Sequence, residues 1–580
     1  MTAGAWRHAA GTIRAHPGSF FISLGFYSVF YGLALLPGLL NRAIFNALSG
    51  HASAGLNVWT LIGLIVGVEL TRSGLLYFGG LILNVFRYAN EALLKSNMMG
   101  WLMSAPGARV LPGTPGEAVS RFRDDAFETA NFPTIFILSA QGLASLVGFS
   151  IMLRINPAIT LVVVVPLIAT IAMTYLLTRH IERYRRAARE ATAAVTSFIG
   201  ETFAAVQSIK LAAAEPRLAD RLAHLNDRRR AASIRDLMFS SVLLFFNTNI
   251  AAIGTGCVLL LAAQAMRSGA FTVGDFVLFA NYLAMVSATP LLVGRGLAAQ
   301  RQSGVSIVRM RGLIDDAPPM KLVDRKQPPQ PAAGVSPPRT DALDTLTVRG
   351  LTRLYPGSER GVHDIDLTLR RGDFTVITGR VGSGKTTLVR ALLGLIPSDA
   401  GEICWNGAVV ADPASFMTPP RSAYTPQAPK LFSETLRDNI LMGEDASDEM
   451  LAVAVELAIF HDDLSRFDLG LATLVGTRGV TLSGGQVQRA AAARMLVREA
   501  DLLVFDDISS ALDVATEQAL WRGLFADGRR SCLAVSHRRE AFRLADEIVL
   551  LDEGRIVARG TADELRNRSE LFRAIWSHNE

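Results

Sequence analysis

The sequence is poor in cysteine, with only Cys257, Cys404 and Cys532 in 580 residues. These three lie far apart and lack metal-ligand spacing, so neither a disulfide framework nor a zinc site is predicted. Charged residues are also sparse at 19%, yet a wholly membrane-buried protein would carry fewer. Hydrophobic residues reach 50% and the mean hydropathy is +0.29, which is unusual for a soluble chain of this length. These values favour a membrane part joined to a soluble part, and the length alone requires at least two domains.

Positive charge is absent from one stretch, because residues 43–57 contain no Lys or Arg. By contrast, residues 87–128 and 179–236 are rich in basic side chains, including the run Arg228–Arg230. Lys and Arg gather on cytoplasmic loops, so the two basic stretches and both termini are predicted to be cytoplasmic and 43–57 to lie outside. The net charge of +6 is therefore interpreted as a marker of membrane orientation, and no nucleic-acid partner is expected.

Six apolar stretches precede residue 315, each near the ~20 residues that a spanning helix needs. They are Ser19–Leu40, Val58–Phe86, Ala130–Leu153, Ala158–Leu177, Leu237–Ala265 and Phe271–Leu292. Only 154–157 separates the third from the fourth, and only 267–270 the fifth from the sixth, so two tight helical hairpins are expected. The first stretch follows a basic N-terminus, as in a signal peptide. No small-residue cleavage site follows it cleanly, so a retained membrane helix is expected.

The texture of the sequence changes after the last apolar stretch. Residues 315–344 are rich in proline mixed with charged side chains, which predicts an extended linker. From residue 345, short β-rich runs at 374–378, 502–506 and 532–536 alternate with helical stretches. This alternation is typical of an α/β P-loop domain. The predicted plan is therefore a transmembrane domain over 1–314, a linker over 315–344 and a nucleotide-binding domain over 345–580.

A phosphate-loop pattern follows the apolar run 374–377 and reads Gly379-Arg380-Val381-Gly382-Ser383-Gly384-Lys385-Thr386. It lies between a predicted strand and a predicted helix, which is the context that such a loop requires. Its glycines let backbone N–H groups converge on phosphates, and the helix N-terminus adds favourable partial charge. Lys385 is expected to reach the β- and γ-phosphates of ATP, and the Thr386 hydroxyl to bind Mg²⁺.

Two adjacent carboxylates, Asp506 and Asp507, end the apolar run that begins at Leu502. Such a pair is usually a capped turn, but the phosphate loop upstream favours a catalytic interpretation. Asp506 is placed to hold Mg²⁺, commonly through water. Asp507 is then the candidate to polarise the attacking water.

A third motif, Leu482-Ser483-Gly484-Gly485-Gln486, precedes a helical run rich in Ala and Arg. Ser483 can cap that helix, and the two glycines expose backbone N–H groups to an anion. One domain needs only one phosphate loop, so this second anion site is predicted to serve the ATP of a partner chain. The motif resembles the ABC signature. The chain as a whole resembles an exporter-type ABC half-transporter, which implies an all-α six-helix transmembrane domain followed by an α/β P-loop ATPase domain.

The resemblance implies roles for further residues. Tyr355 matches the aromatic residue that stacks on adenine, Gln427 the switch glutamine, Asp513 the dimer-facing D-loop and His537 the switch histidine. The implied catalytic residues are Asp507, His537, Lys385 and Gln427, and the implied Mg²⁺ ligands are Thr386, Gln427 and Asp506. The implied nucleotide contacts are Tyr355, Gly379, Arg380, Val381, Gly382, Ser383, Gly384, Lys385, Thr386, Thr387, Gln427, Ser483, Gly484, Gly485, Gln486, Asp513 and His537.

In the membrane half, Gly116–Asp125 and Phe203–Lys210 resemble the two coupling helices of exporters, and Phe271–Phe276 resembles the start of the sixth span. Two features depart from the family pattern. The catalytic carboxylate is usually Glu but here is Asp507, which implies slower hydrolysis. The segment before the signature usually reads Gly-Glu-Arg-Gly, whereas residues 476–479 read Gly-Thr-Arg-Gly.

Polar side chains inside the predicted spans allow two interpretations. Glu69 and Arg72 lie three residues apart, so they share a helix face and can neutralise each other. Asn247 and Asn249 lie in the fifth span. Either set could line a substrate path or stabilise the helix bundle. The pairing interpretation is favoured for Glu69 and Arg72, and the asparagines are left open.

The expected function is ATP-driven export of an amphipathic substrate, such as a lipid, a drug-like molecule or a peptide. The expected partners are a second half-transporter, with a homodimer favoured over a heterodimer, and the surrounding membrane lipid. The expected location is the bacterial cell membrane, with the nucleotide-binding domain in the cytoplasm. An importer of a siderophore or vitamin on the same fold is an alternative. A non-transporting ABC ATPase is disfavoured by the six apolar stretches.

Overall fold

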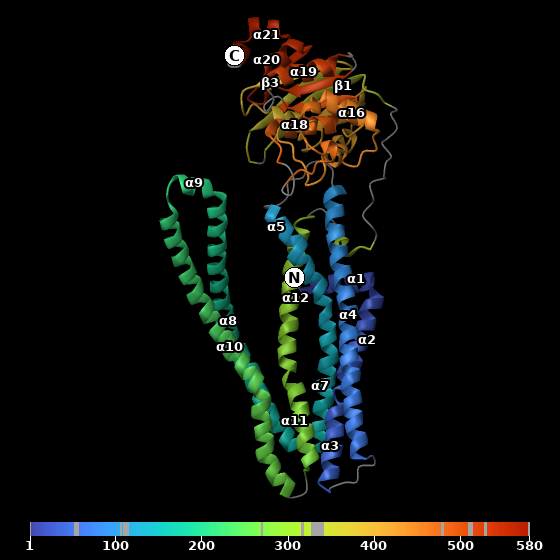
Figure 1. Ribbon diagram of the computed structural model, residues 1–580, viewed down its shortest axis with the longest axis vertical. Helices are drawn as coiled ribbons and strands as arrows, with labels where there is room; N and C mark the ends of the chain where they lie inside the picture. Colours follow the sequence, from blue (N-terminus) through green and yellow to red (C-terminus); the bar gives the residue numbers. More distant parts are fainter. Residues whose placement is uncertain are drawn as a thin grey trace. The chain divides into compact units, whose positions relative to one another are not determined.

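The computed structural model describes residues 2–577 except 51–56, 105–106, 108–114, 268–270, 315–317, 319, 326–340, 356, 477–480, 509–513 and 527–529. Within some helices, chiefly over 163–182 and 243–257, the side chains are not described. The chain forms two compact units, Met1–Trp101 with Pro112–Pro328, and Leu102–Leu111 with Pro329–Glu580. The first unit is helical and the second combines sheets and helices (Figure 1). Most of the predicted linker, 315–344, lies outside the described residues, and the predicted boundaries stay predictions.

The helical unit is built from long helices joined by short turns. They are α1 (Thr2–Ala15), α2 (Pro17–Leu33), α3 (Leu36–Leu48), α4 (Val58–Ser104), α5 (Pro115–Ser120), α6 (Ala126–Asn131), α7 (Ile135–Ile155), α8 (Pro157–Ala204), α9 (Val206–Leu211), α10 (Glu215–Arg267), α11 (Val273–Ser287) and α12 (Thr289–Arg311). A π-helical turn, Arg121–Asp125, lies between α5 and α6, and 3₁₀ turns cover Phe132–Thr134 and Lys321–Val323.

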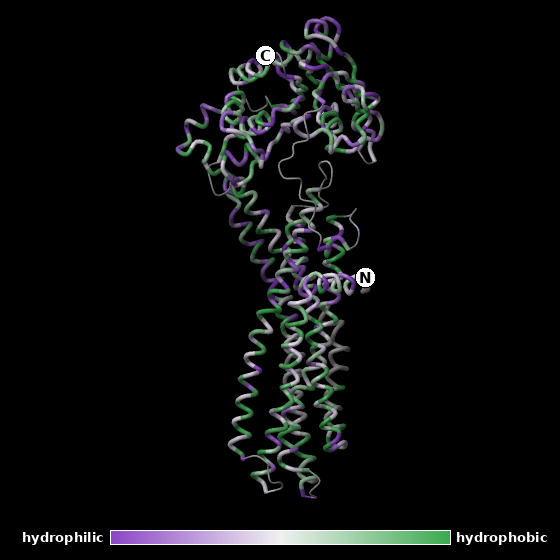
Figure 2. The backbone as a smooth tube through the Cα atoms, turned by 90° about the vertical axis from the view of Figure 1, so that its right-hand side faces the viewer, coloured by the Kyte–Doolittle hydropathy of each residue, from purple (hydrophilic) through white to green (hydrophobic). Residues whose placement is uncertain are grey.

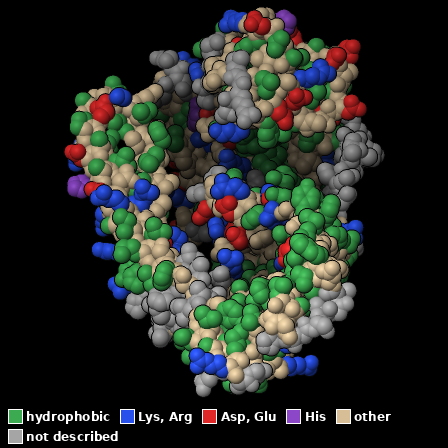
Figure 3. Space-filling model, turned by 60° about the horizontal axis from the view of Figure 1, so that its bottom comes forward, with side chains coloured by type: hydrophobic (Ala, Val, Ile, Leu, Met, Phe, Trp, Pro, Cys, Tyr) green, Lys and Arg blue, Asp and Glu red, His purple; other side chains and the backbone are tan. Residues whose placement is uncertain are grey.

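Every predicted apolar stretch falls largely within these helices. Among the described residues, three segments are long and apolar enough to cross a membrane: Pro17–Leu48, Val58–Met103 and Gly116–Ile155. The fourth and fifth predicted spans fall in α8 and α10, and the sixth in α11 and the start of α12. Figure 2 shows hydrophobic residues concentrated along the lower part of the long helices. Large apolar side chains of the helical unit are exposed, including Trp59 and Leu260, and Figure 3 shows patches of hydrophobic side chains on the face turned to the viewer.

The two predicted hairpins have local causes. Asn156 separates α7 from α8, and its Oδ1 accepts the Ile159 N–H at 3.1 Å while Pro157 occupies the first helical position. Thr272 caps α11 through a capping box with Asp275. The long helices α8 and α10 lie side by side, with α9 at their far end (Figure 1), and Tyr184 stacks on Phe239 at 4.7 Å.

The start of α11 packs closely on α3. The Gly274 N–H donates to Asn46 Oδ1 at 3.1 Å, and Arg42 Nε lies 2.6 Å from Asp275 Oδ1. A Cβ on Gly274 would lie 2.3 Å from the Arg42 carbonyl oxygen, so only glycine fits without displacing backbone. Tyr282, 1% exposed, donates to the Leu35 carbonyl at 2.7 Å. These contacts fix the first span against the sixth.

The predicted intramembrane pair is confirmed. Arg72 Nη1 donates to both oxygens of Glu69, at 2.7 and 2.9 Å, and the guanidinium lies 4.8 Å from the Phe30 ring centroid. Asn249 bonds only its own helix in the described contacts, with Nδ2 donating to Phe245 O at 2.8 Å. The Asn247 side chain lies outside the described residues. The two candidate coupling segments fall in α5 with the π-helical turn, and in α9 with the end of α8.

The second unit contains two sheets. The first is antiparallel, in the order β2-β1-β4-β5, with β1 (Thr345–Leu354), β2 (Gly361–Arg370), β4 (Ala400–Trp405) and β5 (Ala408–Val409). The second has the order β10-β9-β3-β8-β7-β6, with β3 (Phe374–Gly379), β6 (Ser422–Thr425), β7 (Leu502–Asp506), β8 (Ser531–Val535), β9 (Glu547–Asp552) and β10 (Arg555–Gly560). Its strands β9, β3, β8, β7 and β6 are parallel.

Helices of this unit pack on both faces of the parallel sheet and on one another. The helices of the unit are α13 (Lys385–Leu392), α14 (Pro413–Phe416), α15 (Leu436–Leu441), α16 (Asp448–Leu457), α17 (His461–Leu464), α18 (Gly484–Leu496), α19 (Val514–Phe525), α20 (Arg539–Leu544), α21 (Ala562–Arg568) and α22 (Glu570–Ser577). One core contains Leu388 and Leu392 of α13, and the other contains Trp521 of α19. Strands β3, β7 and β8 are buried throughout, which explains their unbroken apolar sequence. Because these strands are parallel, their carboxyl ends lie together on one side of the sheet, and the candidate site lies there.

Candidate nucleotide site

The phosphate loop connects β3 to α13 as predicted. Gly379 has φ +150°, and a Cβ there would lie 2.0 Å from the Leu551 carbonyl oxygen. Gly384 caps α13 with φ +99°, a left-handed conformation that favours glycine. Lys385 Nζ donates to the carbonyls of Gly379 and Arg380 at 2.9 and 2.7 Å. Burial lowers the pKa of Lys385, while Asp507 and Asp506 raise it.

The loop also holds a polar atom suited to a ligand. Ser383 is 3% exposed, and its hydroxyl has no hydrogen-bond partner among the described residues. A buried hydroxyl normally has a partner, so this one fits a phosphate oxygen placed in the loop. Together with the Lys385 ammonium and the N-terminus of α13, it makes a cradle for a polyphosphate.

The predicted metal-binding pair is also brought together. Thr386 Oγ1 donates to Asp506 Oδ1 at 3.0 Å, and the Tyr424 hydroxyl donates to Asp506 Oδ2 at 3.3 Å. Burial raises the pKa of Asp506, while the Thr386 hydrogen bond and Arg390 lower it. Among the described residues, no group of three or more His, Cys, Asp or Glu is placed so that it could hold a metal ion. A hydroxyl beside one carboxylate fits Mg²⁺, which takes its other ligands from phosphate and water.

The candidate base follows directly. Asp507 has φ +57°, and its N–H donates to the Val535 carbonyl of β8 at 3.0 Å. Gln427 Nε2 donates to Asp507 Oδ2 at 3.1 Å. Burial raises the pKa of Asp507, the Gln427 hydrogen bond lowers it, and the neighbouring Asp506 raises it. The structure therefore joins the predicted switch glutamine to the predicted base.

His537 follows β8 at the same edge. Its Nδ1 lies 3.5 Å from Thr378 Oγ1 at the end of β3. Burial and then the charge of Lys385 lower the pKa of His537 to about 4. The imidazole is therefore neutral at neutral pH and can donate one hydrogen bond while accepting another.

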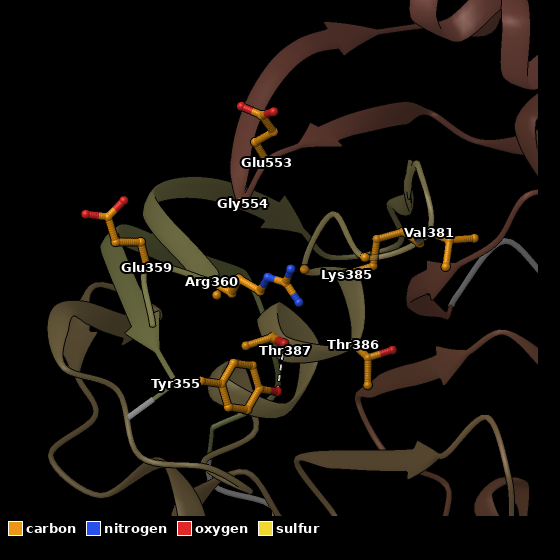
Figure 4. Close-up of a pocket in the computed structure, with 12 residues that line it drawn as sticks. Tyr355, Glu359, Arg360, Val381, Lys385, Thr386, Thr387, Glu553 and Gly554 are labelled. Atoms are coloured by element: carbon orange, nitrogen blue, oxygen red, sulfur yellow. Dashed lines mark hydrogen bonds between the residues drawn. The ribbon is translucent and has the colours of Figure 1, made fainter. Parts of the chain in front are cut away.

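The phosphate loop and Tyr355 border a cavity of about 900 Å³ (Figure 4), whereas Asp506, Asp507, Gln427 and His537 are not among the residues that line it. The Tyr355 hydroxyl lies 3.1 Å from Thr387 Oγ1, a hydrogen bond that ties the aromatic ring to the start of α13. The cavity is lined by Tyr355, Glu359, Arg360, Gly361, Val381, Gly382, Gly384, Lys385, Thr386, Thr387, Glu553 and Gly554. Glu359, Arg360, Gly361, Glu553 and Gly554 belong to none of the sequence motifs and were not predicted.

The signature residues do not line this cavity. Ser483 caps α18 and forms a capping box with Gln486, at 3.3 Å from Gln486 N to Ser483 Oγ and 2.9 Å from Ser483 N to Gln486 Oε1. Behind them lies Asp463, which the sequence did not indicate. Its carboxylate accepts from Gln486 Nε2 at 3.1 Å and from Arg489 Nε at 2.7 Å. The predicted Asp513, the D-loop and 477–479 lie outside the described residues.

Two family descriptions match the chain. "ABC transporter transmembrane region" matches residues 32–289, and "ABC transporter" matches residues 362–510. The chain belongs to the ABC transporters. It is an exporter-type half-transporter in which the membrane and ATPase domains are fused, and an ATP-hydrolysing membrane protein.

Relatives of this ABC transporter match over nearly its whole length. It is 28% identical to the "ATP-dependent lipid A-core flippase" of Bordetella pertussis, over 90% of this chain and 83% of the relative. It is 26% identical to the "Probable multidrug resistance ABC transporter ATP-binding/permease protein YheI" of Bacillus subtilis, over 84% and 83%. A solved bacterial Atm1-family ABC exporter with ATP bound has a similar fold, with TM-score 0.76 and 21% identity over 97% of this chain and 98% of that one.

Proposed function

We propose that this ABC transporter works as a dimer that closes around two ATP molecules and exports an amphipathic substrate from the bacterial cell membrane. The separation of its two anion sites carries the dimer proposal. Lys385 and the phosphate loop border the nucleotide cavity, whereas Ser483 and Gly484 lie outside it with a finished helix cap. The N-terminus of a helix attracts an anion. We propose that the anion at the N-terminus of α18 is the ATP bound to the phosphate loop of a second chain.

The contacts of the site residues support the following proposed roles. Lys385 binds the β- and γ-phosphates, and Tyr355 packs against adenine. Mg²⁺, held by Thr386 and Asp506 with Gln427 nearby, would neutralise phosphate charge. Asp507 accepts a proton from the attacking water, and Gln427 orients its carboxylate. His537, neutral at neutral pH, donates a hydrogen bond to the γ-phosphate.

Composition and relatives support the substrate class. The helical unit exposes many large apolar side chains, and Glu69 and Arg72 neutralise each other. Relatives include a lipid A-core flippase and a probable multidrug resistance transporter. An amphipathic molecule is the cargo that such a surface can admit from the membrane.

Complementation between two defective chains tests the dimer. Lys385→Ala removes the phosphate-loop cation, and Gly484→Asp places a negative charge at the first position of α18, where Asp is compatible with the helix. Each variant alone should lose ATP-driven transport of a fluorescent phospholipid or a lipophilic dye in proteoliposomes. Mixed dimers contain one intact site and should regain part of the ATPase activity. No recovery in verified mixed dimers would contradict the composite site. An active Gly484→Asp homodimer would contradict the role of the signature.

A further inference from the structure

Arg360 lines the nucleotide cavity but belongs to none of the sequence motifs. Figure 4 shows its side chain extending from the β1–β2 loop toward the centre of the cavity, on the side of Tyr355 and Thr387. Among the described residues, no carboxylate pairs with this guanidinium and no side chain accepts a hydrogen bond from it. Arg353, on the neighbouring strand, is by contrast paired with Asp399 at 3.1 Å. Arg360 is therefore an exposed cation on the wall of the cavity, available to bind an anion.

Backbone contacts hold Arg360 between Tyr355 and the phosphate loop. The Tyr355 N–H donates to the Arg360 carbonyl at 3.0 Å, and the Arg360 N–H donates to Ser358 Oγ at 2.9 Å. The next residue, Gly361, pairs with the end of β1, and a Cβ there would lie 1.9 Å from the backbone carbonyl of Arg353. The Gly361 carbonyl also touches the phosphate loop, 2.7 Å from where a Gly384 Cβ would lie. Arg360 is thus held at a defined place relative to the loop.

The neighbours of Arg360 indicate which part of the ligand it meets. Tyr355, at one end of the pocket, is tied to Thr387 and is the residue proposed to pack against adenine. Lys385, proposed to bind the β- and γ-phosphates, is anchored at the other end beside the carbonyls of Gly379 and Arg380. Between the base and the β-phosphate of a nucleotide lie the ribose and the α-phosphate, and only the α-phosphate carries negative charge. A guanidinium offers phosphate oxygens two parallel N–H donors, which a lysine cannot.

We propose that Arg360 binds the α-phosphate of the nucleotide. This inference rests on the proposed binding of ATP by the same pocket. ATP and ADP share the α-phosphate, so Arg360 contributes equally to the affinity for both. The α-phosphate keeps its charge during hydrolysis, so the contact stabilises bound substrate and transition state alike and acts on KM rather than on kcat.

The test measures binding of ATP and ADP to the full-length protein in lipid nanodiscs, together with steady-state ATPase kinetics. The variants are Arg360→Ala, Arg360→Lys and the matched control Arg371→Ala, an exposed arginine outside the cavity. Arg360→Ala should weaken ATP and ADP binding by the same factor, about 10-fold for a charge-assisted contact. It should raise KM similarly and leave kcat unchanged. Arg360→Lys should restore part of the affinity, and Arg371→Ala should match the parent.

Three outcomes would overturn the assignment. Arg360→Ala could bind both nucleotides as tightly as Arg371→Ala does. It could weaken ATP but not ADP, which would place the contact on the γ-phosphate. It could lower kcat with KM unchanged, which would make Arg360 a transition-state residue. Failure of the proposed function is distinguishable from these, because the parent would then bind no more ATP than Lys385→Ala.

Discussion

Replacing Asp507 tests the proposed chemistry most directly. The Asp507 carboxylate accepts a hydrogen bond from Gln427 at 3.1 Å, and the Asp507 backbone N–H donates to the Val535 carbonyl of β8 at 3.0 Å. The carboxylate is therefore fixed in place, but its side chain is one methylene shorter than that of Glu. Glu adds one methylene and moves the carboxylate forward by roughly one C–C bond, ~1.5 Å. A base must come within about 2.6–3.2 Å of its proton, or act through one more water. An Asp at this position is therefore expected to act at reduced efficiency.

The magnitudes follow from the usual contribution of a positioned base, which is about 10²–10⁴-fold in rate. Asp507→Asn should lower turnover by at least about 10-fold and leave ATP trapped, because the proposed contacts of Lys385 with nucleotide and of Asp506 with Mg²⁺ are unchanged. Asp507→Glu should raise turnover by about 10-fold. The positive φ at this position tolerates Asp better than Glu, so Asp507→Glu should also cost about 1 kcal/mol of stability.

Steady-state ATPase activity in lipid, measured from pH 5 to 8, is the assay. Burial raises the pKa of Asp507, so the acid limb of the rate profile should lie above the usual Asp range. Gln427→Ala removes a hydrogen bond that favours the carboxylate, so that limb should move to higher pH. Asp507→Asn turning over as fast as the parent would refute the base assignment. An unmoved acid limb in Gln427→Ala would refute the role of the glutamine.

Three further predictions concern the signature, the topology and the histidine. Asp463→Asn replaces the carboxylate that accepts hydrogen bonds from Gln486 and Arg489 with an amide, so it should lower the thermal midpoint by several degrees. The control Asp462→Asn, at an exposed neighbour, should leave the midpoint unchanged, and equal midpoints for the two variants would contradict the buried network. A cysteine introduced at Ser53 should be labelled from outside intact cells and one introduced at Ser197 only from the cytoplasmic side, and labelling of both from the same side of the membrane would exclude the six-span topology. The pKa of His537 is about 4, below its usual 6.5, so the unfolded chain binds more protons between these values and stability falls as pH falls through them. Thermal scans from pH 7 to 5 should show a smaller loss for His537→Gln than for the parent, and parallel losses would contradict the low pKa.

The parts of the site that follow strand ends could be predicted from the sequence. The phosphate loop, Asp506 and His537 each come directly after an apolar run, and parallel strands bring their carboxyl ends to one edge. The six apolar stretches were equally readable, because a spanning helix needs a long uninterrupted run. Their helical extensions, such as the far part of α8, follow from charged residues that continue the helical pattern.

Contacts between distant segments could not be predicted in the same way. Arg360 reaches the cavity only because the β1–β2 loop folds beside the phosphate loop. Asp463 meets the signature helix across more than twenty residues, and nothing around it in the sequence marks it as buried. Tyr424 was not predicted as a site residue, although it lies only three residues before Gln427, and its hydroxyl donates to Asp506 at 3.3 Å. Side-chain partners of this kind depend on tertiary packing, which local pattern does not encode.

The bonds of Lys385 to its own loop make that loop selective. The Lys385 ammonium donates to the carbonyls of Gly379 and Arg380, so an approaching anion must compete with these two carbonyl oxygens for the ammonium. A lone sulfate or inorganic phosphate must displace these acceptors while touching little else in the cavity. In the proposed binding mode, a nucleoside triphosphate would replace them and would also contact Ser383 and Tyr355. We therefore expect these internal hydrogen bonds to disfavour the binding of simple anions and to leave the loop available for a nucleoside triphosphate.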